Sequence, residues 1–326
     1  MDTIKIRDIE VAHNRIKPYI LNTPLIVNEN INKLTKANVF FKLENLQYTG
    51  SFKLRGACNK ILQLSKNQKS RGLVAYSSGN HAQAVAYASN LFDIDCKIVM
   101  PDNAPKIKIE NTKKFGAKIK FFDYKKESRE KIAEQISKKE KRIIIKPYDD
   151  LEVIKGQGTA GKEIVEELKK LKIIPDVYLC CCGGGGLIAG TSSYIKNIYP
   201  KIKNFSVEPE SFNDTQLSLK NNKIFYNHES SFSICDALLA PTPGKITFPI
   251  NKKILSGGLS VSDEEVKNTI INLAENLKMV VEPGGAVAAT ALLNKKIEVR
   301  NKNVIVMISG GNIDYKFLSS FQKNLK

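Results

Sequence analysis

The chain has 326 residues, of which 42% are hydrophobic and 26% are charged, and these proportions exclude a disordered or collagen-like protein. Lys and Arg number 51 against 33 Asp and Glu, a formal net charge of +18. A nucleic-acid-binding surface would require a basic stretch interleaved with aromatic residues. In this chain the basic residues are scattered, and no such stretch occurs. No apolar run is long enough to span a bilayer, and the first residues lack the apolar core of a signal peptide. We therefore expect a cytoplasmic protein without a nucleic-acid or membrane partner, folded as two domains or one large one.

The six cysteines are too few for a disulfide framework in a chain of this length. Three of them are consecutive, at residues 180–182, and no Cys-x-x-Cys pair occurs. With only three histidines, the ligand spacing of a zinc site is also missing. We interpret the cysteines as small buried side chains in a reducing compartment.

Apolar β-like runs alternate with helix-like segments along most of the chain. This order predicts βαβ units and a mostly parallel sheet. The Ser262 to Glu265 spacing, a capping box, indicates a further helix start. The predicted elements are, in chain order, strand Val39–Leu43, helix Ser51–Leu64, strand Leu73–Tyr76, helix His81–Asn90, strand Cys96–Met100, helix Pro105–Phe115, strand Lys118–Phe122, helix Lys126–Lys139, strand Arg142–Lys146, helix Thr159–Leu171, strand Asp176–Cys182, a helix after the glycine run, strand Phe205–Val207, the helix from Ser262 and strand Asn303–Ile308.

Three loops of small residues follow predicted strands: Ser77–His81, Gly183–Gly186 and Ser309–Asn312. Ligands of open α/β sheets bind outside the carboxyl ends of the strands. We expect the three loops to point to the same edge of a sheet and to form a site there.

The glycine run Gly183–Gly186 links a buried strand to a helix start. Its backbone N–H groups and the helix dipole could hold a phosphate. One alternative is a tight turn with no ligand. Another is dinucleotide binding, because Gly184, Gly186 and Ala189 fit the G-x-G-x-x-A pattern and Glu208 follows about 20 residues later. This loop by itself leaves the alternatives open.

The segment Gly50–Ala57 is the most specific motif in the chain, reading Gly-Ser-Phe-Lys-Leu-Arg-Gly-Ala. A lysine at a helix start has a lowered pKa and is a better amine nucleophile. The segment resembles the Schiff-base segment of pyridoxal-phosphate-dependent serine/threonine dehydratases and serine racemases of fold type II. The resemblance extends over nearly the whole chain, through Thr23-Pro24, Ser77–His81, Gly156–Thr159, the glycine run, Glu282-Pro283 and Ser309–Asn312.

The resemblance implies pyridoxal 5'-phosphate as cofactor. Lys53 would form the Schiff base and act as the base at the substrate Cα. Phe52 would pack beside the ring, Asn80 would bond the 3-oxygen, and Ser309 would face the pyridine nitrogen. The phosphate would lie against residues Gly183, Gly184, Gly185, Gly186 and Leu187.

The resemblance is less specific about the residues that would contact the substrate. The resemblance implies contacts from Ser77, Ser78, His81 and Arg129. Ser78 is either a second acid/base, as in racemases and hydroxyaspartate dehydratases, or a carboxylate-binding residue of the loop. Arg129 aligns with an arginine that racemases can turn toward a carboxylate, against the alternative of a solvated helix residue. His81 either orients the substrate carboxylate or has a structural role.

Residues 208–214 resemble the divalent-cation loop of the family. The implied ligands are the carboxylates of Glu208 and Asp214 and the carbonyl of Phe212. Two carboxylates and a carbonyl, completed by water, suit Mg²⁺ or Ca²⁺. The alternative is an acidic surface turn after a strand.

By resemblance we expect an α/β fold of two three-layer open-sheet domains, with the cofactor in the cleft between them. The large domain would comprise residues 1–52 and 149–326, and the small one residues 53–148. The expected reaction is β-elimination from L-threonine or L-serine, giving a 2-oxo acid and ammonia, in a homodimer. The alternatives are a serine racemase, a 3-hydroxyaspartate dehydratase and, more remotely, a nicotinamide-dependent oxidoreductase.

Overall fold

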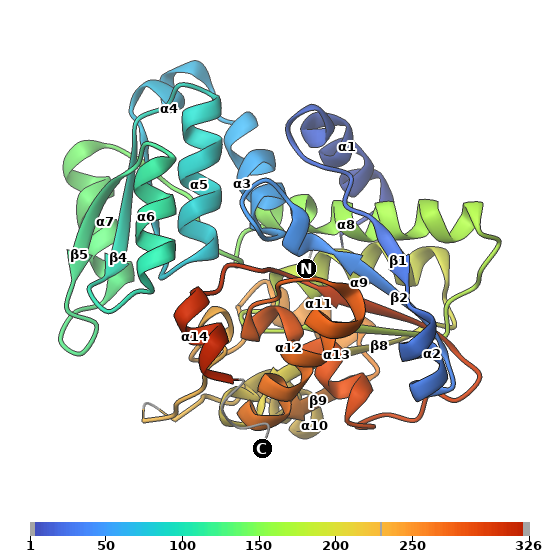
Figure 1. Ribbon diagram of the computed structural model, residues 1–326. Helices are drawn as coiled ribbons and strands as arrows, with labels where there is room; N and C mark the ends of the chain where they lie inside the picture. The colour runs from blue at the N-terminus through green and yellow to red at the C-terminus, as the bar shows by residue number, and fades with distance from the viewer. Residues whose placement is uncertain (1–3, 229, 322–326) are drawn as a thin grey trace.

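Two open sheets form the frame of the computed structural model, which describes residues 4–228 and 230–321 (Figure 1). The larger sheet has the strand order β1-β2-β10-β7-β8-β9, and the smaller one the order β5-β4-β3-β6. β1 and β2 are antiparallel, and the other pairs are parallel, as the alternating pattern predicts. The strands are β1 Leu25–Val27, β2 Asn38–Leu43, β3 Leu73–Tyr76, β4 Cys96–Pro101, β5 Lys118–Phe122, β6 Ile143–Ile144, β7 Val177–Cys181, β8 Lys203–Pro209, β9 Gly257–Val261 and β10 Asn303–Ile308.

Helices cover both faces of each sheet, so the α/β layer architecture expected from the resemblance is confirmed. The α-helices are α1 Ile6–Ile16, α2 Glu29–Thr35, α3 Lys53–Leu62, α4 Lys66–Ser70, α5 Asn80–Leu91, α6 Lys106–Lys114, α7 Arg129–Glu140, α8 Leu151–Lys170, α9 Gly186–Ile198, α10 Asp214–Asn221, α11 Thr247–Ile254, α12 Asp263–Leu277, α13 Pro283–Leu293 and α14 Tyr315–Ser320. The short 3₁₀ turns of the described residues are η1 Lys17–Tyr19, η2 Glu44–Leu46, η3 Glu210–Phe212 and η4 Asp236–Leu238.

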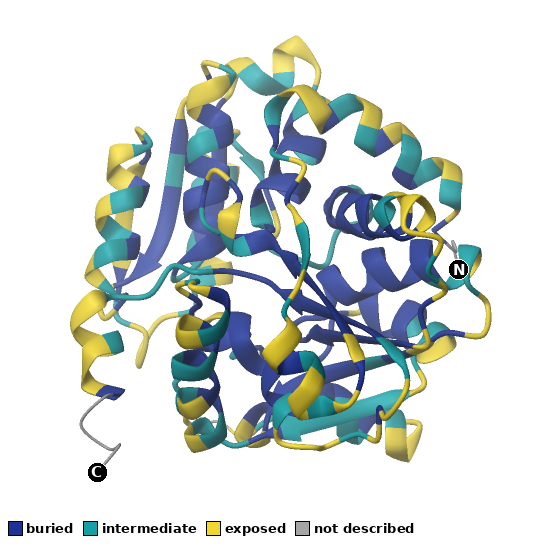
Figure 2. Ribbon diagram, turned by 45° about the vertical axis from the view of Figure 1, so that its right-hand side comes forward, coloured by how far each residue is buried: buried dark blue, intermediate teal, exposed yellow. Residues whose placement is uncertain are grey.

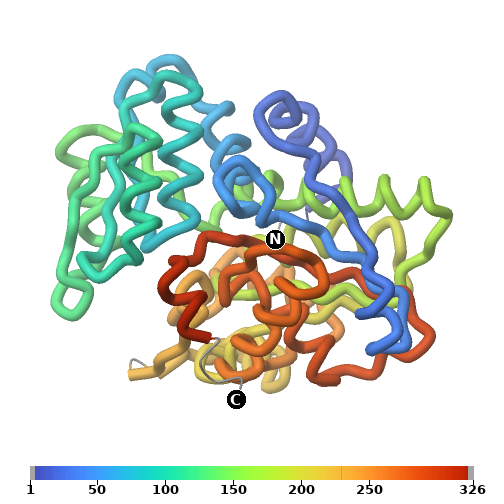
Figure 3. Tube along the Cα trace, in the orientation of Figure 1, coloured from blue at the N-terminus to red at the C-terminus, as the bar shows by residue number. Residues whose placement is uncertain are grey.

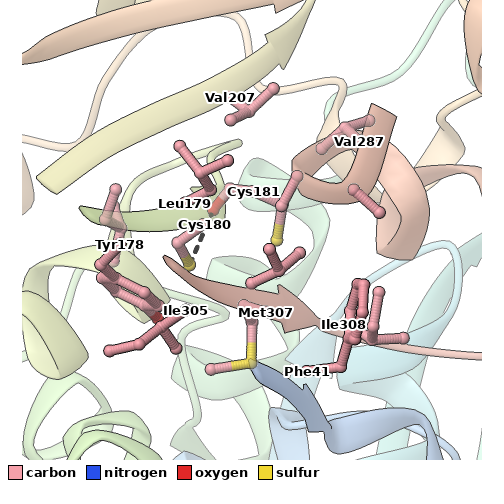
Figure 4. Close-up of a cluster of buried hydrophobic side chains, with 14 of the residues drawn as sticks. Phe41, Tyr178, Leu179, Cys180, Cys181, Val207, Val287, Ile305, Met307 and Ile308 are labelled. Carbon is pink, nitrogen blue, oxygen red and sulfur yellow. Dashed lines mark hydrogen bonds between the residues drawn. The ribbon is translucent and has the colours of Figure 1, made fainter. Parts of the chain in front are cut away.

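The larger sheet lies between two helical layers. α9 packs on β7 and β8 and is itself covered by α8 and α1, while α13 packs on β7, β8, β9 and β10 and is covered by α12. The side chains of the inner strands β2, β10, β7 and β8 are largely buried on both faces, whereas the edge strands β1 and β9 are more exposed, and Figure 2 shows strands in dark blue and in teal accordingly. A close-up of this core shows Leu179 of β7 and Ile305 of β10 among buried apolar side chains (Figure 4).

The smaller sheet shows why its central strand β3 reads as a continuous apolar run. In β3, Leu73 and Ala75 face the core shared with α5 and α3, whereas Val74 faces the core under α7. Because successive side chains point to opposite faces, a parallel sheet with both faces covered needs apolar residues at every position. All four strands of this sheet lie between β2 and β7 in sequence (Figure 3).

Most predicted elements are present, with three instructive differences. The strand predicted over Arg142–Lys146 is reduced to Ile143–Ile144, because only those residues pair with β3. The helix predicted from Thr159 begins at Leu151, where the Asp150 carboxylate accepts from the first helical N–H groups. The sequence pattern also missed β9, which begins with two glycines.

Glycines inside α8 are there for close packing. A Cβ on Gly156 would lie 2.6 Å from the backbone oxygen of Arg55 in α3. A Cβ on Gly190, in α9, would lie 2.3 Å from the backbone oxygen of Ile154 in α8. Gly156 thus brings α8 against α3, the helix that begins with Lys53.

Among residues 4–228 and 230–321, no helix is long and apolar enough to cross a membrane.

Candidate active site

A cavity of about 670 Å³ is lined by residues from both sheets. The three small-residue loops reach it, but not along one sheet edge as expected. The loop starting at Ser77 follows β3 of the smaller sheet, whereas the loops starting at Gly183 and Ser309 follow β7 and β10 of the larger one. The predicted cofactor and substrate residues that line it are Phe52, Lys53, Ser77, Ser78, Asn80, His81, Arg129, Gly183, Gly184, Gly185, Gly186, Leu187 and Ser309.

Lys53 is the first residue of α3, and its amine borders this cavity. Nζ donates a hydrogen bond to the backbone oxygen of Pro147 at 2.8 Å and lies 5.1 Å from the centre of the Phe52 ring. Burial lowers the pKa of Lys53 to about 8, because an apolar surrounding disfavours the ammonium. An amine of this kind is neutral in a useful fraction near physiological pH, so it can act as a nucleophile or a base.

A buried charge cluster holds α3 two residues after Lys53. Nε of Arg55 lies 2.7 Å from Oε2 of Glu44, and Nη1 lies 2.7 Å from Oε1 of Glu163. Nζ of Lys42 lies 2.6 Å from the other Glu163 oxygen. All four side chains are fully buried, so removal of any one would leave a buried charge unpaired. The cluster therefore fixes α3 to β2 and α8.

The glycine run forms a backbone cradle at the start of α9. Gly185 has φ +86°, a left-handed conformation that favours glycine, and a Cβ there would lie 2.6 Å from Nδ2 of Asn251. Thr247 Oγ1 donates to the Gly184 carbonyl at 2.6 Å, and Asn251 Nδ2 donates to the Gly185 carbonyl at 3.3 Å. With these carbonyls bonded to α11 and the first N–H groups of α9 lacking partners within the helix, the cradle suits an anion.

Asn80 begins α5 and is held from the larger sheet. Its Nδ2 donates to Oε1 of Glu282, and its Oδ1 accepts from Nδ2 of Asn312 at 2.9 Å. Asn312 also donates to the backbone oxygen of Thr49. The Asn80 amide is thereby fixed between the loop after β3 and the loop after β10.

Lys108 is a site residue that the sequence pattern missed. Its buried Nζ lies 2.6 Å from Oδ2 of Asp236 and 3.2 Å from Oε2 of Glu282. Burial would lower the pKa of Lys108, but Glu282 and Asp236 outweigh it and raise the pKa above its ordinary value. A Cβ on Gly79 would lie 2.5 Å from Cδ and 3.1 Å from Nζ of Lys108, so the Lys108 side chain lies beside the Ser77–His81 loop. Nothing distinguished Lys108 among many lysines, although the Glu282-Pro283 motif pointed to its partner.

His81 is buried and neutral. Its Nε2 is 2.8 Å from the backbone oxygen of Ile145, which requires a proton on Nε2, and its Nδ1 has no partner among the described residues. Burial and the nearby Lys53 charge lower the pKa of His81 to about 3. The free Nδ1 is thus an acceptor, which suits a donor more than a carboxylate.

Arg129 begins α7 and lies partly exposed at the cavity. Its Nε is 2.8 Å from Oε1 of Glu130, and its guanidinium lies 5.9 Å from the centre of the Tyr76 ring. The pair with Glu130 uses only part of the guanidinium, so the remaining N–H groups can meet a second acid.

The predicted metal residues lie outside this cavity. Glu208 is buried at the end of β8, and its two oxygens accept from the backbone N–H groups of Thr215 and Gln216. Asp214 is also buried, and its Oδ2 has no hydrogen-bond partner among the described residues. Burial raises the pKa of Asp214 to about 7, and burial together with Asp214 raises the pKa of Glu208 well above its ordinary value.

The fit to a hard cation rests on the orphaned Oδ2 of Asp214, because a buried carboxylate oxygen without a partner is a ligand that such a cation accepts. Within residues 4–228 and 230–321, no three His, Cys, Asp or Glu side chains are grouped as metal ligands. A cation here would therefore need a backbone carbonyl, and Phe212 at the end of η3 is the expected one.

Comparisons with known proteins agree with this geometry. The family described as pyridoxal-phosphate dependent enzyme matches residues 16–310. A serine racemase of Dictyostelium discoideum is 39% identical over 100% of this chain and 99% of its own, and an L-threo-3-hydroxyaspartate ammonia-lyase of Saccharomyces cerevisiae is 38% identical over 95% and 93%. A solved threonine deaminase from T.th. superposes with a TM-score of 0.90 at 34% identity, over 96% of this chain and 99% of that one.

Proposed function

Because the chain belongs to the pyridoxal-phosphate-dependent enzymes, in the group of serine racemases and threonine dehydratases, we propose that it eliminates the β-hydroxyl of L-serine, L-threonine or both. The products would be a 2-oxo acid and ammonia. The observation that carries this proposal is the buried Lys53 amine, with a pKa of about 8, on the wall of a cavity that also holds the glycine cradle.

Residues of both sheets would hold the cofactor. Lys53 would bind its aldehyde carbon, residues 183–187 its phosphate, Asn80 its 3-oxygen and Ser309 its ring nitrogen, with Phe52 beside the ring. When bound, pyridoxal phosphate supplies an electron sink that acidifies the Cα proton of an amino acid. Ser309 offers a neutral hydroxyl where an aspartate would keep the ring nitrogen protonated. A weaker electron sink favours loss of the β-hydroxyl over transamination.

The protein's own groups would do the proton chemistry. The neutral Nζ of Lys53 would accept the Cα proton, held in place by the Pro147 carbonyl. The hydroxyls of Ser77 and Ser78 line the same cavity and would donate to the substrate carboxylate.

Two features each favour a further candidate function, serine racemisation and elimination from 3-hydroxyaspartate. Ser78 borders the cavity with a hydroxyl that could protonate the other face of Cα, which serine racemisation requires. Arg129 borders it too and could bind the second carboxylate of 3-hydroxyaspartate. Relatives bearing both names match nearly the full length of the chain.

The direct test is Lys53→Ala, with Lys60→Ala as the matched control. Lys60 lies on the same helix but pairs with Asp150, and it does not line the cavity. Wild type and the control should show a visible cofactor absorbance that borohydride removes, and should form 2-oxo acid from serine or threonine. The Lys53→Ala variant should lose both. Near-normal elimination by this variant would refute the proposed role of Lys53.

Three finer points belong to the same proposal. A Mg²⁺ or Ca²⁺ ion would bind Glu208, Asp214 and the Phe212 carbonyl, supported by the orphaned Asp214 oxygen. A cytoplasmic location is supported by six cysteines that are all free.

We also propose a homodimer, and a division into a large domain of residues 1–52 and 149–326 and a small domain of residues 53–148. The division is supported by the separate cores on the two sheets, with the difference that Ile16 and Ile20 of the first segment pack in the core of the smaller sheet.

A further inference from the structure

The side chain of Asn227 joins two segments that belong to different candidate sites. Its Nδ2 donates to Oδ1 of Asp214 at 2.6 Å and to the backbone oxygen of Ala240 at 2.7 Å. Because an amide nitrogen carries two protons, one side chain can make both bonds at once. Asp214 is one of the two carboxylates proposed to bind a cation, whereas Ala240 lines the cavity of the candidate active site.

The segment that Asn227 holds forms one wall of that cavity, which residues 236–240 all line. A Cβ on Gly183 would lie 3.2 Å from Cα of Leu238, so the backbone of this segment packs on the first glycine of the cradle. The same segment carries Asp236, the partner of the Lys108 ammonium. Because protein interiors are closely packed, a displacement of residues 236–240 would change the contacts of both the cradle and Lys108.

The Asp214 carboxylate has one oxygen bonded to Asn227 and one oxygen free. Oδ1 accepts from Asn227, while the buried Oδ2 has no hydrogen-bond partner among the described residues. A cation can therefore bind Oδ2 without displacing Asn227. It would fix the carboxylate, and Asn227 would transmit that constraint to the backbone of Ala240. The backbone N–H of Asn227 also donates to the Pro241 oxygen at 2.9 Å, a contact that a change of the side chain leaves in place.

We propose that Asn227 is a positioning residue that couples cation binding at Asp214 to cofactor binding in the cavity. The proposal rests on the proposed function, because it presumes pyridoxal phosphate in the cavity and a cation at Glu208 and Asp214. Coupling between two binding sites is reciprocal. The cation must therefore strengthen cofactor binding by the same factor as the cofactor strengthens cation binding.

Cofactor affinity, measured by absorbance with and without Ca²⁺, tests the coupling. In metal-stripped wild type, Ca²⁺ should lower the Kd of pyridoxal phosphate about fivefold or more, the lower end of typical coupling between two sites. Asn227→Ala should still bind Ca²⁺ in calorimetry, but Ca²⁺ should then change the cofactor Kd by less than about twofold. Asn221→Ala is the matched control, because Asn221 is an exposed residue of α10 whose Nδ2 donates to the Leu217 carbonyl. This control should couple like wild type.

Hydrogen exchange follows the same coupling in the protein without cofactor. Ca²⁺ should slow amide exchange over residues 236–242 in wild type and in Asn221→Ala, because the cation fixes the carboxylate to which Asn227 is bonded. In Asn227→Ala, Ca²⁺ should slow exchange only around the cation itself, over residues 208–216. This measurement requires neither turnover nor bound cofactor.

The outcomes separate this inference from the proposed function. If wild type forms no borohydride-sensitive absorbance, both fail. If wild type forms it, but Ca²⁺ changes neither the cofactor Kd nor exchange over residues 236–242, only the coupling fails. If Asn227→Ala weakens cofactor binding yet keeps the full effect of Ca²⁺, Asn227 contributes packing alone and its positioning role is overturned.

Discussion

Nζ of Lys108 lies 2.6 Å from Oδ2 of Asp236, which connects α6, packed near the smaller sheet, with η4 beside the larger one. Glu282, at the start of α13, contacts the same ammonium at 3.2 Å and also accepts from Asn80. These contacts join the two sheets at the wall of the cavity. They hold the Ser77–His81 loop, which follows β3, against the larger sheet.

The first prediction concerns the stability of this junction. Lys108→Met should leave the buried Glu282 carboxylate without its cation and lower the free energy of unfolding by about 3–5 kcal/mol. The exposed pair Lys118–Asp95 provides the control, since Lys118→Met should cost no more than about 1 kcal/mol. Urea unfolding measures both, and equal losses would show that the Lys108 contacts contribute no more than a surface pair.

The second prediction uses the pKa of Lys53. Because the lowered pKa of about 8 is a property of the folded state, the cofactor-free protein should capture pyridoxal phosphate at a rate that rises with pH and is half-maximal near 8. A solvated lysine would reach this point only at about 10.4. Between these values the unfolded chain holds the proton more tightly than the folded chain, so this group's contribution to stability rises with pH. Stopped-flow absorbance follows the capture, and a midpoint near 10 would contradict the burial of Nζ.

The local sequence predicted elements well where their pattern is local. Strand Lys118–Phe122 and the capping box at Ser262 match the structure because alternation and capping depend on neighbours in the chain. The helix predicted from Thr159 begins eight residues earlier, at Leu151. Glycines are poor helix formers, but Gly156 and Gly158 of α8 are required by contact with α3 and α9. Contacts between segments that are far apart in the chain cannot be predicted from the local periodicity of apolar residues.

The site residues differ in the same way: those in a local motif were predicted, and those paired only by the fold were not. Motif residues such as Lys53 and Asn80 were predicted to share a site by resemblance and do line one cavity. Lys108 and Asp236 were not found, because each is an ordinary charged residue until the fold pairs them across two sheets. Cys181 was predicted to be a buried core side chain like its neighbours, because the sequence does not show which face of the strand borders the cavity.

The third prediction separates elimination from racemisation. Ser78→Ala should lower racemisation of serine and any action on D-serine by about 10²-fold or more, the usual contribution of a positioned acid or base. Elimination from L-serine should fall by less than about tenfold if Lys53 serves that face. Chiral chromatography and 2-oxo acid formation measure the two reactions on one preparation. Equal loss of both would assign Ser78 to substrate binding alone.

The fourth prediction concerns an acidic substrate. Arg129→Ala should raise the KM for 3-hydroxyaspartate at least about tenfold, since a charge-assisted bond to the second carboxylate would be lost. The KM for serine should change little, because serine has no second carboxylate. Arg142→Ala, which removes a guanidinium paired with Glu140 and Asp95 away from the cavity, is the control. A parallel rise for both substrates would place Arg129 in a general structural role.

The last prediction tests the cation at Glu208 and Asp214. A ligand that binds only the folded state at a hundredfold excess over its Kd adds about 2.7 kcal/mol of stability, so EDTA should lower the melting temperature and Mg²⁺ or Ca²⁺ should restore it. Asp214→Ala should abolish this response but keep the visible cofactor absorbance, because Asp214 does not line the cavity. Glu210→Ala, at an exposed acid in the same loop, should respond to EDTA like wild type. If chelation leaves the melting temperature unchanged and elemental analysis finds no bound metal, the site holds no cation. The two buried carboxyl groups are then neutralised by protonation instead.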